Sequence, residues 1–137
     1  PYTTLFRSVG VAEYQNIEIK PVVYFKEYEE TNEELCPASA ASSDIQVFIR
    51  YPKIIGIEDE LSNKINNILK NYSGINDLEP QTTFEIDYTI MFLNEHFLSI
   101  LYRGSAMHCQ DNHPVTWYRT LNISLKNGKP LKLNEIF

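Results

Sequence analysis

Four side chains that can bind a metal ion or take part in nucleophilic chemistry fall within six residues: His108, Cys109, Asp111 and His113. Zinc accepts all of these ligand types. The sequence has no second Cys/His pair at the spacing of a zinc finger, and turns between strands commonly collect Asp, Asn and His. We therefore expect a polar turn here, and we assign no metal and no other cofactor.

Catalytic chemistry has no clear candidate either. Adjacent residues of a strand point to opposite faces, so His108 is not expected to reach the sulfur of Cys109, and no oxyanion donor is identifiable. Glu85 and Asp87 share one strand face at a spacing that glycosidases also use, but catalytic pairs need a cleft and a shifted pKa, and a solvated face explains them more simply. We expect a protein that is not an enzyme.

Aromatic side chains offer a binding surface. Tyr88, Tyr102, Trp117 and Tyr118 could stack on sugar rings or anchor a protein partner, and the alternative is that they belong to the core or to cross-strand pairs. The candidate binding residues are therefore Tyr102, His108, Asp111, His113, Trp117 and Tyr118.

The elements that would position these residues are mostly strands. Apolar residues alternate with polar ones from residue 84 to residue 92, and the alternation resumes from 97 to 102 after a polar turn, which predicts an antiparallel hairpin. A third strand, 115–125, has one packed face and one wet face. Asn127-Gly128 predicts a tight turn with positive φ at both residues, and Pro130 opens a short edge strand, 130–133.

The first half of the chain predicts two more strands and the only helix. Residues 17–28 alternate, with Pro21 favouring an edge, and residues 45–51 form a strand that Pro52 should end. The acidic stretch 27–43 has no periodicity and is expected to be a loop. One apolar stripe marks a helix over 58–72: Ile57, Leu61, Ile65, Ile68, Leu69 and Tyr72. The prediction is an α+β domain, with one main helix on an antiparallel sheet of about five to six strands.

Composition limits the domain organisation and the partners. The first eight residues, PYTTLFRS, match the translation of a common sequencing adapter, so the biological domain is expected to be 9–137. Residues 134–137 look like the first turn of a helix that the chain does not complete, which predicts truncation before a further domain. A formal net charge of −6 argues against nucleic acid and against an anionic membrane surface.

Several segments together resemble a known family: YPKIIG at 51–56, KIN at 64–66, FLSI at 97–100 and NISLKNGKPLKLNEIF at 122–137. Their order and spacing resemble the deacetylase PdaC domain, DUF4163, which often precedes a DUF3298 domain. The resemblance implies an extracytoplasmic, usually membrane-anchored protein of the bacterial cell envelope. Such proteins include a peptidoglycan deacetylase, which carries its chemistry in a separate domain, and an anti-sigma factor that senses lysozyme.

The resemblance therefore implies a non-catalytic binding or sensing module whose partner is peptidoglycan or a cationic protein such as lysozyme. The alternatives are an accessory domain that positions a separate deacetylase, or a structural spacer. Because the implied compartment is oxidising, a disulfide between Cys36 and Cys109 would join the 27–43 and 103–114 loops, and the alternative is two separate thiols. The oligomeric state and the identity of the ligand stay open.

Overall fold

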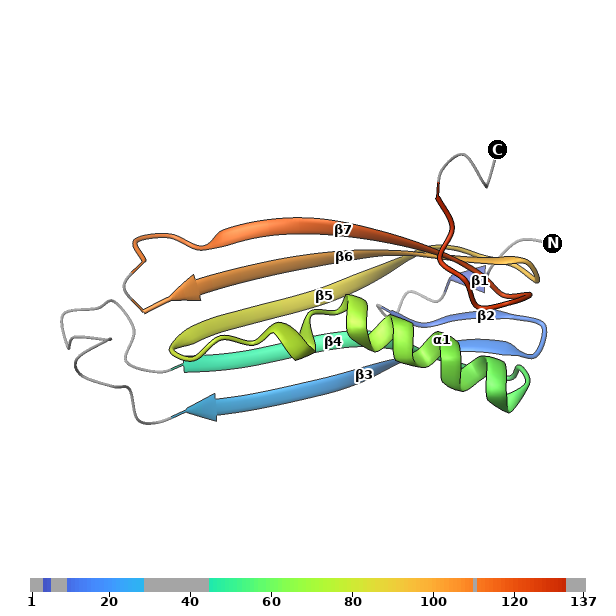
Figure 1. Cartoon of the computed structure of the whole chain (residues 1–137), viewed down its shortest axis with the longest axis horizontal. Helices are drawn as coiled ribbons and strands as arrows, with labels where there is room; N and C mark the ends of the chain where they lie inside the picture. Colours follow the sequence, from blue (N-terminus) through green and yellow to red (C-terminus); the bar gives the residue numbers. More distant parts are fainter. Residues whose placement is uncertain (1–3, 6–9, 29–44, 110, 133–137) are drawn as a thin grey trace.

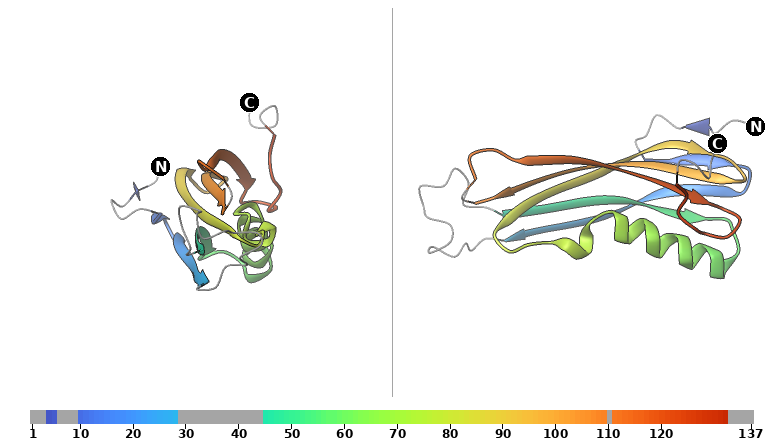
Figure 2. Two further views of the ribbon diagram at one scale, coloured as in Figure 1. Left: turned by 90° about the vertical axis from the view of Figure 1, so that its left-hand side faces the viewer. Right: turned by 45° about the horizontal axis from the view of Figure 1, so that its top comes forward.

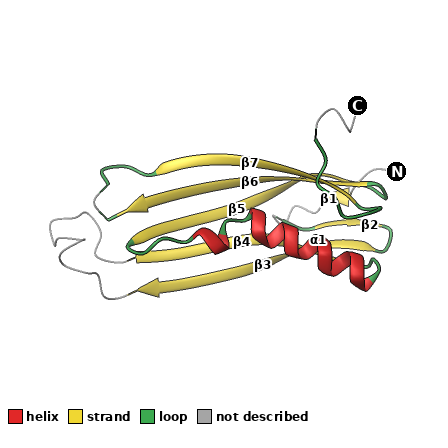
Figure 3. Cartoon of the chain, viewed as in Figure 1, coloured by secondary structure: helices red, strands yellow, loops and turns green. Residues whose placement is uncertain are grey.

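The structure, a computed structural model, describes residues 4–5, 10–28, 45–109 and 111–132. Within these ranges one sheet holds seven strands in sequence order (Figures 1 and 3): β1 (Thr4–Leu5), β2 (Ala12–Tyr14), β3 (Ile17–Tyr28), β4 (Ile45–Ile55), β5 (Thr82–Leu93), β6 (Phe97–His108) and β7 (Val115–Ser124). The described helices are α1 (Asp59–Tyr72) and the single 3-10 turn η1 (Ile75–Asp77). The predicted α+β fold is confirmed. β1 lies inside the stretch expected to derive from an adapter.

One pair of strands is parallel. β4 and β5 pair only through Val47–Ile49 and Phe84–Ile86, and the other neighbours are antiparallel. A parallel pair needs a crossover connection, and α1 with η1 supplies it. Beyond Ile49 the two strands diverge, and α1 lies against β4 in the space that opens. The end-on view of Figure 2 shows the strands curving round one another, with α1 on one side.

The apolar stripe of α1 packs as its spacing predicts. Ile65 and Leu69 are fully buried, and the other stripe residues are partly buried against the same core. That core continues into the sheet through alternate residues of β5, β6 and β7, among them Ile90, Ile100 and Ile123. No helix among the described residues is long and apolar enough to cross a membrane.

Side chains of the sheet satisfy carbonyl groups at the end of α1. The Tyr102 hydroxyl donates to the Leu69 carbonyl at 2.7 Å, and Arg119 Nη1 donates to the Tyr72 carbonyl at 3.0 Å. The last carbonyls of a helix lack partners within the helix, and a cation is favourable beside them. The contact explains why a charged residue, Arg119, stands in the apolar row of β7.

Two prolines face each other in the sheet. β4 runs past Pro52 to Ile55, so the expectation that Pro52 ends this strand is wrong. Pro52 is the register partner of Pro21 on β3, and neither residue has an N–H to donate. Such a pair fits only where the backbone groups of both residues point away from each other, as they do at alternate positions of an antiparallel ladder. From Lys20 to Tyr28, β3 has no partner on its other side among the described residues, as Pro21 suggested.

A bulge in β5 and the turn after β7 also differ from expectation. A register shift between Ile90 and Phe92 leaves Phe92 43% exposed and buries Leu93 instead, because a bulge reverses the alternation of side chains. At the turn predicted from Asn127-Gly128, only Gly128 has positive φ. The turn is longer than expected, because the Gly128 N–H bonds back to the Ser124 carbonyl. The expected strand after Pro130 is reduced, among the described residues, to a bridge with Ile123; residues 133–137 lie outside them.

Candidate functional site

A hollow of about 320 Å3 lies on the face of the sheet opposite the buried residues of β5. Strands β5, β6 and β7 line it with charged, hydroxyl and aromatic groups: Glu85, Asp87, Arg103, Gly104, Ser105, Thr116 and Tyr118. Tyr118 is 68% exposed. Of the predicted binding residues, this is the one that the hollow contains.

The strand register explains this grouping. Successive side chains of a strand alternate between faces, so the buried residues Phe84, Ile86 and Tyr88 leave Glu85 and Asp87 on the other face. Two rows then cross the three strands. One row is Glu85, Ser105 and Thr116, and the other is Asp87, Arg103 and Tyr118. The small hydroxyl residues of the first row, Ser105 and Thr116, leave the space that the hollow occupies.

Asp87, at the β5 end of the second row, is fixed by two hydrogen bonds. Its Oδ1 accepts a hydrogen bond from Arg50 Nε at 2.9 Å and another from the Tyr88 N–H at 2.7 Å. Arg50 itself lies with its guanidinium carbon 5.5 Å from the centre of the Tyr88 ring, and its Nη2 is buried without a partner in the described part of the structure. The ion pair between Arg50 and Asp87 balances the charge of the Asp87 carboxylate. Glu85 and Arg103 are therefore the charges that the hollow offers to a ligand.

The lining consists largely of hydrogen-bonding groups. Within the first row, the Glu85 carboxylate stands next to its register partner Ser105. Glu85 and Asp87 are two residues apart, about 7 Å along the strand, but Asp87 already accepts from Arg50. What remains is a ring of hydrogen-bonding groups beside an exposed aromatic face, a combination that suits polar ligands with an apolar side, such as sugars.

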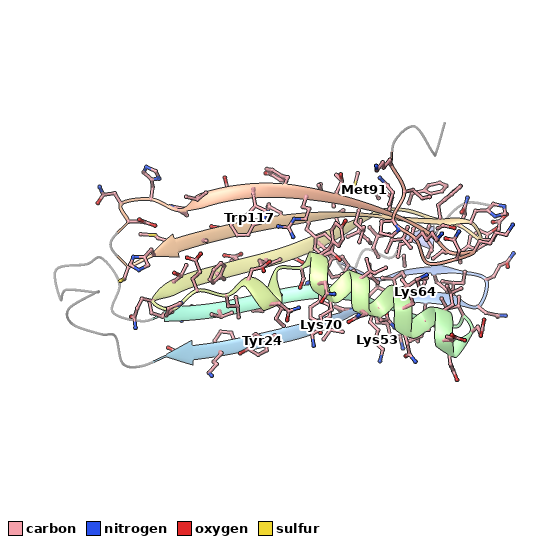
Figure 4. All side chains as sticks on the ribbon, in the orientation of Figure 1. Tyr24, Lys53, Lys64, Lys70, Met91 and Trp117 are labelled. Atoms are coloured by element: carbon pink, nitrogen blue, oxygen red, sulfur yellow. The ribbon has the colours of Figure 1, made fainter. Side chains whose placement is uncertain are left out.

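Trp117, labelled in Figure 4, precedes Tyr118 in β7 and therefore lies on the opposite face of that strand. Its indole packs on Gly104, where a Cβ atom would stand 2.2 Å from Cε2. Trp117 also lines a second hollow of about 230 Å3, whose other lining residues are Gly74, Asp77, Glu79, Phe84, Ile86, Ala106 and Arg119. Trp117 is therefore partly a packing residue, and it does not share the hollow that contains Tyr118.

Tyr102 does not fit the role of a surface residue. Its side chain is 1% exposed, and its hydroxyl is used by the Leu69 carbonyl. Burial also raises the pKa of Tyr102, because the low-dielectric core disfavours the phenolate. Its place is in the core, the alternative that its aromatic character left open.

The polar turn between β6 and β7 is closed by its own residues. Asp111 Oδ2 accepts from the His108 N–H at 3.0 Å, and the Asp111 N–H donates to the His108 carbonyl at 2.9 Å. His113 is exposed. In the ranges that the structure describes, no three His, Cys, Asp or Glu side chains gather as a metal site would require. The lining of the hollow does not include His108, Asp111 or His113.

Cys109 differs from expectation in one respect. Its Sγ lies 3.8 Å from His108 Nδ1, because Cys109 follows the last residue of β6 and is no longer bound by strand alternation. The structure has Cys109 as a disulfide-bonded residue, which leaves no thiol for nucleophilic chemistry. Cys36 lies outside the described residues, so the Cys36–Cys109 pairing stays a prediction.

Sequence reasoning missed Arg50, Arg103, Ser105 and Thr116 as residues of a common site. Alternation placed Thr116 on a wet face, but Arg103 and Ser105 were expected in the 103–114 loop, whereas β6 continues to His108. The register that sets these residues side by side was not known. Counting back from the turn at 93–96 would have placed Gly104 opposite Asp87, because Leu93 pairs with Leu98; the bulge between Ile90 and Phe92 shifts the register by one residue and sets Arg103 there instead.

Comparison with known proteins concerns the fold. No protein-family model matches the chain, and no curated protein matches it in sequence. A DUF3298 family protein from Bacteroides fragilis is similar in structure over 87% of this chain and 60% of its own, with a TM-score of 0.59 and 11% identity. A DUF3298 family protein from Pseudomonas aeruginosa is similar over 85% of this chain and 56% of its own, with a TM-score of 0.53 and 10% identity. The chain thus spans less than two thirds of each of these proteins.

At such low identity the likeness concerns the fold alone. The predicted membership of DUF4163 is not confirmed, since no family model matches. The chain has the fold seen in DUF3298 family proteins.

Proposed function

We propose that this chain is a non-catalytic binding module of the bacterial cell envelope that recognises peptidoglycan at the hollow formed by β5, β6 and β7. The observation that carries the proposal is the pairing of an exposed aromatic face, Tyr118, with Glu85, Arg103, Ser105 and Thr116 on the uncovered side of the sheet. A sugar ring has an apolar face that can stack on Tyr118, and its hydroxyl and acetamido groups can bond to the surrounding polar groups.

The family resemblance supports the cellular setting. Residues 9–137 are proposed to be a DUF4163-like domain of an extracytoplasmic protein, anchored to the membrane only through a segment outside this chain. An accessory role beside a separate deacetylase domain would use the same glycan contact, whereas a structural spacer would need no ligand.

A cationic protein such as lysozyme is the second candidate partner. The observation in its favour is the formal net charge of −6, which would steer a basic protein towards this surface. Such steering weakens as salt rises, because the screening length falls to about 8 Å at physiological ionic strength. Glycan binding through hydrogen bonds and stacking should depend much less on salt.

The test is calorimetric titration of the full chain with soluble peptidoglycan fragments and, separately, with hen lysozyme. Glu85→Gln and Arg103→Ala should each weaken binding of the fragments by about tenfold, or about 1.4 kcal/mol. Glu60→Gln is the matched control, since it makes the same charge change in the first turn of α1, away from the hollow. Equal effects of Glu85→Gln and Glu60→Gln on binding would show that the hollow is not the binding site. If the wild type binds neither the peptidoglycan fragments nor lysozyme, the role of a structural spacer remains.

A further inference from the structure

The outer edge of β7 carries a row of unpaired backbone groups. At the end of β7 the returning chain does pair with this edge: the Ser124 N–H donates to the Lys129 carbonyl at 3.0 Å, and the Leu131 N–H donates to the Asn122 carbonyl at 2.7 Å. These bonds show that even-numbered residues of β7 direct their N–H and C=O groups away from β6. Antiparallel ladders alternate, so Thr116, Tyr118 and Thr120 do the same.

This stretch lies open along the rim of the sheet (Figure 1). β7 is the last strand of the sheet in the described part of the chain, and the residues from Val115 to Thr120 are exposed except for Trp117, which is partly buried. Proteins usually protect such edges with Lys, Pro, inward charges or bulges. The segment VTWYRT contains neither Lys nor Pro and is rich in β-branched and aromatic residues, which favour strand pairing. Its one charged residue, Arg119, is an inward charge that donates to the Tyr72 carbonyl at 3.0 Å.

The open part of β3 is built differently. Its pairing with β2 ends at Ile19, and the stretch that follows contains Pro21, Lys20, Lys26 and Glu27. Proline removes a donor and the charges oppose association, so this edge has the usual protection. The contrast singles out β7 as the edge suited to a partner strand.

We propose that β7 pairs with β7 of a second copy of this chain, antiparallel and centred on Tyr118, so that two sheets become one. The sequence of the edge is self-complementary about that residue. Tyr118 would face Tyr118 of the partner subunit, Thr116 would face Thr120 of the partner subunit, and Trp117 would face Arg119 of the partner subunit.

Each of these pairs is favourable in a sheet. Aromatic pairs and Thr–Thr pairs stabilise antiparallel strands, and an arginine can lie over the face of a tryptophan. The outward groups of residues 116, 118 and 120 in each copy would form about six main-chain hydrogen bonds.

The unpaired part of the β7 edge, from residue 116 to residue 120, has limits on both sides that fit the same twofold axis. On one side, Asn122 is already bonded to the returning chain. On the other side, Pro114 precedes the strand and has no N–H to offer. The outward-facing residues between these limits are centred on Tyr118, so an isologous contact uses the whole of this part of the edge and leaves none of its groups unpaired.

This interface goes beyond the proposed glycan contact and does not depend on it. Tyr118, Thr116 and the rest of the hollow lie on one face, so a twofold axis through β7 would set two hollows on one continuous surface. A polymeric ligand could then engage both, with a gain in avidity.

The experiment is sedimentation equilibrium of the full chain from about 10 μM to about 1 mM, a range that covers the weak affinities expected of a small contact. The wild type should show a monomer–dimer equilibrium. Tyr118→Lys and Tyr118→Glu should each weaken dimerisation at least tenfold, because like charges would face each other across the axis. An equimolar mixture of the two variants should restore the dimer.

Two further variants separate the edge from the rest of the surface. Thr89→Lys adds the same charge on an exposed position of β5 and should leave the dimer unchanged. Thr120→Pro removes an outward N–H without breaking the bonds to β6, so it should abolish the dimer and leave the circular dichroism spectrum intact. A wild type that stays monomeric throughout the range, or a dimer that survives both Tyr118→Lys and Thr120→Pro, would overturn the proposal.

Discussion

The side-chain amide of Asn66 makes both hydrogen bonds that a neighbouring strand would make to Ile54. Asn66 Oδ1 accepts from the Ile54 N–H at 2.7 Å, and Asn66 Nδ2 donates to the Ile54 carbonyl at 3.0 Å. The position exists because β5 pairs with β4 only as far as Ile49, which leaves the rest of that edge without a strand. Ile54 is fully buried, so water does not replace the missing partner.

Asn66→Ala should therefore destabilise the domain by about 2 kcal/mol, chiefly by leaving the Ile54 N–H without a partner. The Ile54 carbonyl keeps a bond from the Ser62 hydroxyl at 3.2 Å, which limits the loss. Urea unfolding followed by circular dichroism measures the effect. Asn67→Ala, at an exposed position of the same helix turn, is the control and should cost nothing, since Ala is the better helix former. Equal stabilities of the two variants would contradict this role for Asn66.

Local periodicity was enough to predict most of the elements. The bounds of β3 match the expected 17–28, and α1 begins one residue after the expected start, because the alternation and the apolar stripe arise from burial of one face. The same rule assigned Glu85 and Asp87 to a wet face. Long-range pairing has no such local signal, which is why the parallel contact between β4 and β5 was not predicted.

The candidate site depended on that missing information. Tyr118 was predicted as a binding residue from its type alone, and so was Tyr102, yet one is exposed in the hollow and the other is in the core. Their positions on opposite faces of neighbouring strands decide the difference. The register of β6 against β5 and β7, which sets Arg103 between Asp87 and Tyr118, could be known only from the structure.

Gly104→Ala should test the contact between β6 and β7. The added Cβ would meet the indole of Trp117 at 2.2 Å, so the ring must move, at a cost of about 1–3 kcal/mol. Trp117 is the single tryptophan of the chain, and a shift of its fluorescence emission to longer wavelength should report the displacement. In a Trp117→Ala background the cost of Gly104→Ala should fall markedly, because the obstructing ring is absent. An unchanged cost in that background would place the strain elsewhere.

Tyr102→Phe should show how firmly the end of α1 is held by the sheet. The substitution removes the hydrogen bond to the Leu69 carbonyl and leaves that buried acceptor without its side-chain donor, at an expected cost of about 1–2 kcal/mol. Tyr118→Phe removes an exposed hydroxyl and should stay within about 0.5 kcal/mol of the wild type. Thermal unfolding of the two variants compares them directly, and similar losses would mean that the Tyr102 hydroxyl bond contributes nothing specific.

The buried tyrosines should also make the domain sensitive to alkali. Desolvation raises the pKa values of Tyr88 and Tyr102 above the value of about 10 that a tyrosine has in an unfolded chain. A raised folded-state pKa stabilises the fold fully below about pH 10, and this contribution is lost as pH rises further, by up to about 1.4 kcal/mol per pH unit for each group. Urea unfolding between about pH 8 and pH 11.5 should show the decline. Because Tyr102→Phe removes one of the two groups, its stability should fall less steeply than that of the wild type, whereas Tyr118→Phe should follow the wild-type slope. Parallel slopes for all three proteins would show that burial of Tyr102 does not govern the alkaline transition.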